Sequence, residues 1–193
     1  FVALLGLIFL LRYAMLGDPD FHVDEQFYFV VADRMWAGDL PYVDIWDRKP
    51  IGLFLIYAAL RPLSGDSLIA VQIAGHIFNA LTAAVIWDLS SRHLGRWKAL
   101  LPAALYVVWM GAFGGANGQS PVFHNSMVAG AFWLLARAWR DADRGQVVYA
   151  GLGAMALIGV AIQVKYTPVF PGIAIGLAFM WLEWSRRKSF PRL

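Results

Sequence analysis

Cysteine is absent from the 193-residue sequence, which excludes a disulfide framework, a thiolate nucleophile and any metal site built on cysteine. Charged residues are scarce as well: they make up 15% of the chain, whereas a soluble domain carries about 25%. No phosphate-binding P-loop, dinucleotide-binding glycine motif or zinc-protease HExxH motif occurs. Because 60% of the residues are hydrophobic and 9 are tryptophan, the composition indicates a membrane protein.

Basic residues outnumber acidic ones and give a net charge of +3, yet their arrangement argues against a nucleic-acid partner. They gather in three short clusters between apolar runs, a pattern that marks the cytoplasmic side of membrane helices. The clusters are Arg92, Arg96 and Lys98; Arg137, Arg140 and Arg144; and Arg186, Arg187, Lys188 and Arg192. We therefore expect all three clusters to face the cytoplasm.

Apolar segments of suitable length alternate with these clusters. A helix rises about 1.5 Å per residue, so a hydrocarbon core of about 30 Å needs roughly 20 residues. Phe1–Leu16 lacks a basic start and a small-residue cleavage site, so it is interpreted as a truncated first span and not as a signal peptide. Further spans are predicted at Ser67–Leu89, Ala99–Phe113, Val122–Trp139, Val147–Val164 and Pro168–Trp184.

Ile51–Leu63 is apolar but too short to cross comfortably. If it crossed, every later loop would change sides and the basic clusters would lie outside. We therefore place residues 17–66 on the outer face, with Ile51–Leu63 lying in the membrane interface. The predicted fold is an all-α polytopic membrane protein with about six transmembrane helices. Residues 1–193 would form one transmembrane module of a longer protein.

The outer segment concentrates acidic residues, since residues 22–50 hold six of the 13 in the chain. Its first part, DEQFYFVVADRMW, has helical periodicity. The predicted apolar stripe consists of Phe27, Val30, Val31 and Trp36, with Phe21 before it. Asp24 and Glu25 would occupy the first turn, where the helix dipole favours carboxylates. A second interfacial helix would begin after Pro50, because proline is favoured at a helix start.

Charged residues stand at both ends of this segment, with Asp24 and Glu25 at one end and Asp47, Arg48 and Lys49 at the other. A carboxylate can take a proton from an acceptor, and a cation can stabilise a departing phosphate. The alternative is a solvated loop whose acids merely suit a helix dipole. The many aromatic residues favour a segment packed on the bilayer.

The stretch HVDEQFYFVVADRMWAGDLPYVDIWDRKPIGLFLIYAAL resembles the first outer loop of the GT-C membrane glycosyltransferases. It is most similar to the family 39 type, which includes protein O-mannosyltransferases and lipid A aminoarabinose transferases. The matching features are Asp24-Glu25, Ala32 to Met35, Gly38-Asp39 and Asp47 to Pro50. The similarity continues through SRHLGRWKALLPAALY and QVKYTPVFPGIAIG, and so covers nearly the whole chain.

The resemblance implies transfer of a sugar from a polyprenyl-phosphate carrier to a lipid, protein or glycan acceptor, with inversion, on the outer face of a bacterial inner membrane. Asp24 would be the general base, and Glu25 would support it through charge or hydrogen bonding. Lys49, helped by Arg48, would hold the departing phosphate. Further candidates for substrate or phosphate binding are Tyr28, Arg34, Asp47 and Lys165.

Relatives often carry an acidic residue in the second outer loop, where some use it for a divalent metal. Here that loop, NGQSPVFHNSM, contains no acid. A divalent metal held by Asp24, His124 and a third ligand is one alternative. A carrier site without metal and an inactive relative are the others.

Polar residues in or beside the spans also have two interpretations. Lys165, at the outer end of a span, either extends its ammonium to the interface or supplies a second cation for the carrier phosphate. His76 and Asn79 share one face of the predicted span at residues 67–89, which favours hydrogen bonding between helices.

Two other functions stay open on the sequence alone: a transporter or flippase of lipid-linked or small solutes, and a non-catalytic assembly subunit. Transporters usually place ionisable residues near the bilayer midplane and contain internal repeats. Here the charges lie at span ends and no repeat is visible. The missing acid in the second outer loop favours the non-catalytic subunit.

Overall fold

The computed structural model describes residues 1–18, 23–141 and 143–188, which form eight α-helices and one short 3₁₀ turn. The helices are α1 (Val2–Arg12), α2 (Val23–Trp36), α3 (Ile51–Ser64), α4 (Ile69–Leu94), α5 (Leu100–Ala112), α6 (Ser120–Asp141), α7 (Arg144–Val164) and α8 (Val169–Lys188). The 3₁₀ turn, Tyr13–Met15, continues α1. These described residues contain no β-strand, so the predicted all-α fold is confirmed.

All the helices expected from the sequence are present, although some ends differ. α4 continues five residues past its predicted end at Leu89, and Gly95 follows it with a φ of 78°. By length and composition, Ile69–Leu94 and Gly145–Val164 are able to cross a membrane, among the residues described. The total of six spans stays a prediction.

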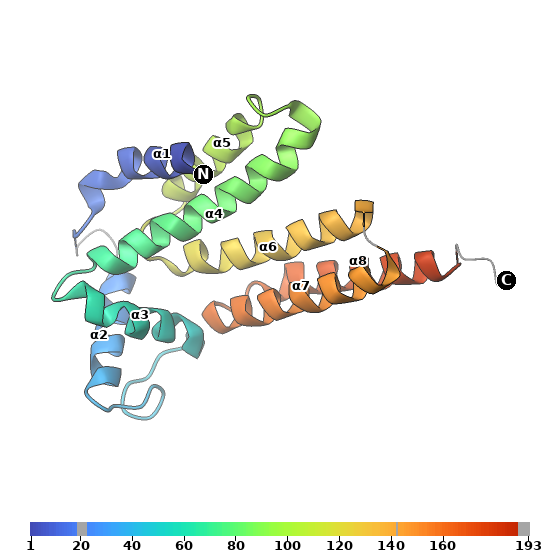
Figure 1. The fold of residues 1–193 in the computed structure, drawn as a ribbon. Helices are drawn as coiled ribbons and strands as arrows, with labels where there is room; N and C mark the ends of the chain where they lie inside the picture. Colours follow the sequence, from blue (N-terminus) through green and yellow to red (C-terminus); the bar gives the residue numbers. More distant parts are fainter. Residues whose placement is uncertain (19–22, 142, 189–193) are drawn as a thin grey trace.

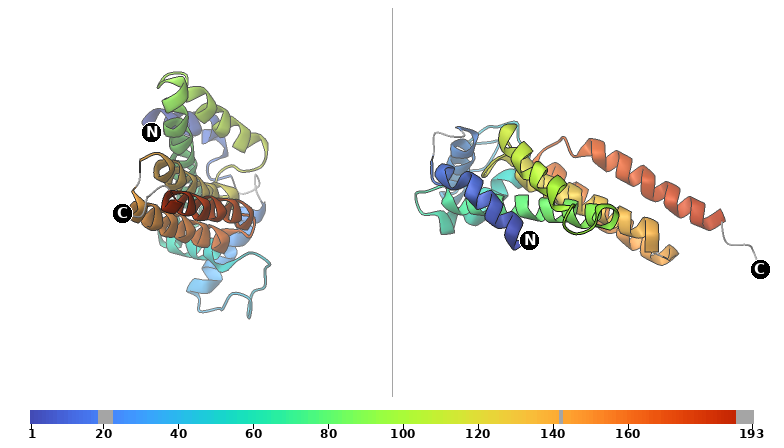
Figure 2. Two further views of the ribbon diagram at one scale, coloured as in Figure 1. Left: turned by 90° about the vertical axis from the view of Figure 1, so that its right-hand side faces the viewer. Right: turned by 90° about the horizontal axis from the view of Figure 1, so that it is seen from above.

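The long helices α4, α6 and α7 run beside one another, with α1 and α5 on the α4 side and α8 on the α7 side (Figures 1 and 2). α2 and α3 lie together at one end of this bundle (Figure 1). The start of α4, the start of α6 and the end of α7 all point to that end. The outer segment is therefore packed onto the ends of several long helices.

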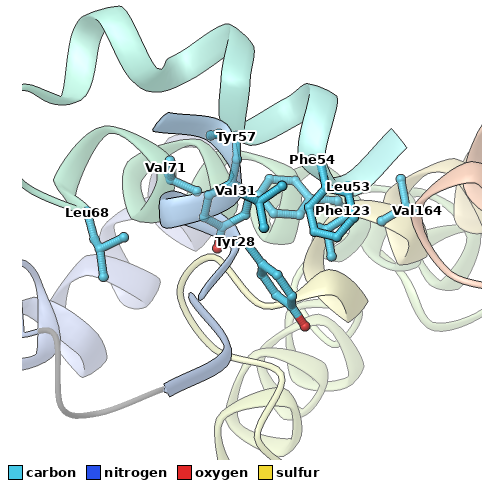
Figure 3. Packing of buried hydrophobic residues seen from close by; sticks show 10 residues of the cluster. Tyr28, Val31, Leu53, Phe54, Tyr57, Leu68, Val71, Phe123 and Val164 are labelled. Atoms are coloured by element: carbon cyan, nitrogen blue, oxygen red, sulfur yellow. The ribbon is translucent and has the colours of Figure 1, made fainter. Parts of the chain in front are cut away.

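A compact apolar core joins α2 and α3 to the bundle (Figure 3). Its buried residues include Tyr28, Val31 and Ala32 of α2, Leu53, Phe54 and Tyr57 of α3, Val71 of α4, Phe123 of α6 and Val164 of α7. The predicted stripe on α2 was wrong in part, because Val30 is 50% exposed and Trp36 is 64% exposed. Residues three and four apart share a helix face, so burying Tyr28 also buries Val31 and Ala32 and turns Val30 outward.

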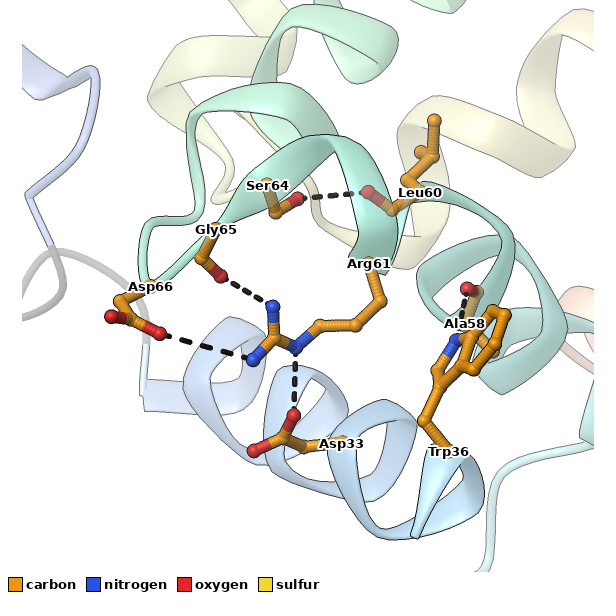
Figure 4. Close-up of polar contacts among 8 residues, drawn as sticks. All are labelled: Asp33, Trp36, Ala58, Leu60, Arg61, Ser64, Gly65 and Asp66. Atoms are coloured by element: carbon orange, nitrogen blue, oxygen red, sulfur yellow. Dashed lines mark hydrogen bonds and ion pairs between the residues drawn. The ribbon is translucent and has the colours of Figure 1, made fainter.

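Arg61 of α3 reinforces the contact between α2 and α3 (Figure 4). Its Nε donates to Asp33 of α2 at 2.8 Å, and another guanidinium nitrogen donates to the carbonyl of Gly65. Nearby, the indole of Trp36 donates to the carbonyl of Ala58 at 2.8 Å. These polar contacts, added to the apolar core, fix α2 on α3.

Arg12, at the end of α1, is a cation that is only 2% exposed. Its guanidinium donates to the carbonyl of Val107 in α5 at 3.1 Å. The amide of Asn79 in α4, turned so that its oxygen faces Arg12, accepts at 2.6 and 3.2 Å. His76, one turn earlier, pairs with the side chain of Asn117 at 3.2 Å. The predicted hydrogen bonding between helices is thus found for Asn79, whereas the partner of His76 lies in the segment between α5 and α6.

Candidate active site

Asp24 lies exposed in the first turn of α2, and Tyr28 lies one turn later. The Tyr28 hydroxyl donates to Asp24 Oδ2 at 3.1 Å, a contact that the i, i+4 spacing favours. Burial, followed by the charge and hydrogen bond of Asp24, raises the pKa of the Tyr28 phenol. The phenol therefore stays protonated near neutral pH and remains a donor to the carboxylate.

The loop between α2 and α3 brings Lys49 to the same place. Asp47 Oδ1 accepts from the backbone N–H of Lys49 at 2.6 Å, and the Tyr42 hydroxyl donates to the Lys49 carbonyl at 2.7 Å. The Lys49 ammonium lies 5.6 Å from the centroid of the Tyr28 ring, within the range of a cation–π contact. The two charged ends of the outer segment therefore meet at Tyr28.

Lys165 approaches from a third direction, since it directly follows α7. α7 comes close to α3 at Gly52, where an added Cβ would lie 2.6 Å from the backbone oxygen of Gln163. Burial, and then the charge of Lys49, lowers the pKa of Lys165, whereas Asp24 acts in the opposite sense. Of the two interpretations of Lys165, these neighbours favour a cation belonging to the site.

The arrangement therefore combines one exposed carboxylate with two cations that come from separate segments of the chain. A carboxylate can accept a proton from a hydroxyl group. Cations held in advance can stabilise negative charge that develops on a leaving phosphate. These are two of the requirements for moving a group from a phosphate ester to a hydroxyl.

Glu25 points elsewhere, although it is the next residue after Asp24. Its side chain is 1% exposed; Oε1 accepts from the backbone N–H of Gly118 at 3.0 Å and Oε2 from the amide of Gln72 at 3.2 Å. Burial raises the pKa of Glu25 to about 7; hydrogen bonds from Gln72, Gly118 and Gln119 oppose this rise, and the Asp24 charge adds to it. The two acids of the pair therefore have different surroundings.

Other candidates fall at or beyond the edge of this region. Arg48 is exposed, and its charge and that of Asp47 act on the Tyr28 phenol. Arg34 lies ten residues after Asp24, which is about 15 Å along the helix axis, and it pairs with Asp39. The structure does not bring Arg34 to the site.

His124 in α6 lies near enough to Lys165 for their charges to interact. It is 8% exposed, and neither ring nitrogen has a hydrogen-bond partner. Within residues 1–18, 23–141 and 143–188, no group of three His, Cys, Asp or Glu side chains could hold a metal ion. We therefore derive no metal chemistry from the pair Asp24 and His124.

The sequence reasoning missed the partners of Glu25, which are Gln72 of α4 and Gly118 in the segment between α5 and α6. One signal was available. Gln72, His76 and Asn79 recur at positions i, i+4 and i+7 of an apolar helix, and all three are fully buried. Such a polar stripe predicts a buried polar contact on that face, but it does not identify the residues that form it.

Residues 48–192 match the protein family described as dolichyl-phosphate-mannose-protein mannosyltransferase. The chain belongs to this family. Membership confirms the resemblance to the GT-C glycosyltransferases and identifies the chain as a membrane glycosyltransferase. No curated protein and no solved structure matches the chain.

The family match covers the cations of the site but not the acids. Arg48, Lys49 and Lys165 fall within residues 48–192, whereas Asp24 and Glu25 precede them. Any role for Asp24 or Glu25 in this transferase therefore rests on the geometry around them.

Proposed function

We propose that this glycosyltransferase moves a sugar from a polyprenyl-phosphate carrier to a hydroxyl-bearing acceptor at the outer face of a bacterial inner membrane. The observation that carries the proposal is the meeting of Asp24 and Lys49 at Tyr28, with Lys165 near enough for its charge to interact with both. The family description names a phosphate-linked mannose, so polyprenyl-phosphate mannose is the donor chosen for the experiments below. The acceptor is a lipid, a protein or a glycan.

In the reaction, the acceptor oxygen forms a bond to the anomeric carbon while the bond from that carbon to the phosphate oxygen breaks. The proton of the acceptor hydroxyl passes to Asp24, which is exposed and so accessible to the acceptor. The bonding electrons leave with the phosphate, so the products are the glycosylated acceptor and the polyprenyl phosphate. Attack opposite the leaving phosphate inverts the anomeric centre.

The positive charges act on the leaving group. Lys49 and Lys165 come from different segments, so a phosphate between them would be held from two sides. Arg48, exposed on the same loop, adds charge at the entrance. Because the negative charge on the departing oxygen grows in the transition state, pre-placed cations stabilise that state more than the bound donor.

The outer location follows from the basic clusters, which the positive-inside pattern places in the cytoplasm. Residues 17–66 then form an outer segment that carries Asp24 and Lys49, within one transmembrane module over residues 1–193. α3 would lie in the interface, where its apolar face packs on the bundle.

Asp24→Asn tests the proposal. The variant keeps the shape of the side chain but cannot accept the proton, so turnover of polyprenyl-phosphate mannose should fall about 100-fold or more. Release of polyprenyl phosphate in the presence of membrane acceptors gives the rate. Asp66→Asn is the matched control, because Asp66 is a fully exposed acid of the same outer segment. Unchanged turnover in Asp24→Asn, with normal folding, would rule out Asp24 as the base.

A further inference from the structure

The segment that joins α5 to α6 is buried where it meets α2 and α4. Ala116, Asn117 and Gly118 are all buried, and Asn117 has a positive φ of 52°. A residue other than glycine adopts that backbone region at a cost, so surrounding contacts must hold it there. The segment, residues 113–119, is called the 113–119 loop below. It includes the first three residues of the predicted second outer loop, NGQSPVFHNSM, whereas the rest of that stretch, from Ser120 on, belongs to α6.

Three elements hold this loop by direct contacts. Glu25 of α2 accepts from the N–H of Gly118 at 3.0 Å, and Tyr57 of α3 donates to the carbonyl of the same residue at 3.0 Å. His76 of α4 pairs with the Asn117 side chain at 3.2 Å. Both backbone groups of Gly118 are thus bonded to side chains of α2, which carries Asp24, and of α3, which directly follows the loop of Lys49.

The backbone of the loop also touches α4 directly. An added Cβ at Gly75 would lie 1.8 Å from the backbone oxygen of Asn117, so the close approach requires glycine at that position. Gln72, one turn before His76, donates to Glu25 at 3.2 Å and accepts from the N–H of Gly17 at 2.7 Å. The contact therefore extends to the chain that connects α1 with α2.

We propose that Glu25 is a positioning residue, which fastens the 113–119 loop to the first turn of α2 and so sets where Asp24 stands relative to Lys165. This inference rests on the proposed function, because Asp24 and Lys165 matter only if they serve sugar transfer. Asp24 and Glu25 are adjacent on one helical turn, so a shift of the backbone at Glu25 also moves Asp24. On the far side, the 113–119 loop leads directly into α6, which carries His124, a residue near enough to Lys165 for their charges to interact.

The second outer loop contributes to this contact although it contains no acid. In place of a carboxylate, this loop contributes a backbone N–H, and the carboxylate that meets it is Glu25 of the first outer segment.

A reporter cysteine can follow the loop, since the chain has no cysteine of its own. Ala116→Cys places a small thiol at a position that is 3% exposed, so it should react slowly with a maleimide in the detergent-purified protein. Adding Glu25→Ala should raise the labelling rate about tenfold or more, as expected for a local opening, and should lower kcat for polyprenyl-phosphate mannose with little change in KM. Adding Glu25→Gln should keep the cysteine protected and retain most of kcat, because the amide oxygen still accepts from Gly118.

Gly75→Ala perturbs the same contact from α4 without touching Glu25. Alanine normally stabilises a helix relative to glycine, but here its Cβ displaces Asn117. We expect the same faster labelling and lower kcat as in Glu25→Ala. Gly159→Ala is the control, because nothing lies within 4 Å of a Cβ at that position of α7. If Glu25→Ala does not fold, Tyr57→Phe removes the other side-chain bond to Gly118 and replaces it in the comparison.

The possible outcomes separate the proposals. Slow labelling in both Glu25→Ala and Gly75→Ala, or fast labelling with full kcat, overturns the positioning role. A protected cysteine in Glu25→Gln together with lost kcat also overturns it, because the charge of Glu25 would then act in the chemistry. Full turnover in Asp24→Asn would contradict the proposed function. The labelling rates would then still measure whether Glu25 holds the 113–119 loop.

Discussion

The Tyr28 hydroxyl donates to the Asp24 carboxylate at 3.1 Å, while the face of the same ring lies 5.6 Å from the Lys49 ammonium. One buried aromatic residue therefore contacts both charged ends of the outer segment. The contact explains how a carboxylate and an ammonium more than twenty residues apart in sequence come to lie in one region. It also separates two effects of Tyr28, a polar one on Asp24 and an aromatic one on Lys49.

Tyr28→Phe should lower turnover about tenfold, since it removes one hydrogen bond to a charged group but keeps the ring beneath Lys49. Tyr28→Leu should lower turnover further, because it also removes the cation–π contact. Both rates are measured as polyprenyl phosphate released. Tyr149→Phe is the matched control, because Tyr149 is 77% exposed on α7. Equal rates for Tyr28→Phe and the wild type would show that the hydrogen bond has no part in positioning Asp24.

Removing a cation should weaken both donor binding and the chemical step. We expect Lys165→Met to lower kcat/KM for polyprenyl-phosphate mannose about 100-fold, and Lys165→Arg to recover part of that loss. The double variant Lys49→Met with Lys165→Met should lose less than the product of the single losses, because both cations act on one phosphate in the proposed reaction. Lys98→Met, in a basic cluster predicted to face the cytoplasm, is the control. Fully additive losses would place the two lysines on different groups of the donor.

Glu25 should make the stability of the protein depend on pH. Its pKa is raised from the ordinary value of 4.5 to about 7, mainly by burial. Between these two pKa values the folded state holds a proton that the unfolded chain releases. The contribution of Glu25 to the free energy of unfolding is therefore complete below pH 4.5 and is lost as the pH rises through 7. The total is about 3 kcal/mol, at roughly 1.4 kcal/mol for each pKa unit.

The apparent unfolding temperature in detergent should therefore fall as the pH is raised from about 5 to about 8. Glu25→Gln should show a flatter profile, and the difference between the two proteins isolates Glu25 from the other titrating groups. Parallel profiles for the two proteins would mean that Glu25 is not the group responsible.

Sequence reasoning predicted the helices well because their signals are local. The apolar runs, together with the helical periodicity of α2, identified all eight helices of the described residues, but length alone does not distinguish α3, with 14 residues, from α5, with 13. Sequence reasoning could not separate the roles of Asp24 and Glu25, because neighbouring residues on a helix point about 100° apart and only tertiary packing decides which one is buried. Likewise, the Gly118 partner of Glu25 lies 93 residues away and contributes only a backbone N–H, a group that every residue except proline carries.

The close approach of α3 and α7 at Gly52 gives a last test, because it sets how near Lys165 comes to Lys49. A Cβ at Gly52 would lie 2.6 Å from the backbone oxygen of Gln163, two residues before Lys165. Gly52→Ala should therefore push the end of α7 away and lower turnover about tenfold, a loss expected when a catalytic group is misplaced. Gly6→Ala, where nothing lies within 4 Å of the added Cβ, is the control. The decisive measurement is a double-mutant cycle: in the Lys165→Met background, Gly52→Ala should cost much less, because the cation it displaces is already gone. An undiminished cost in that background would show that Gly52 serves the packing of α3 and not the placement of Lys165.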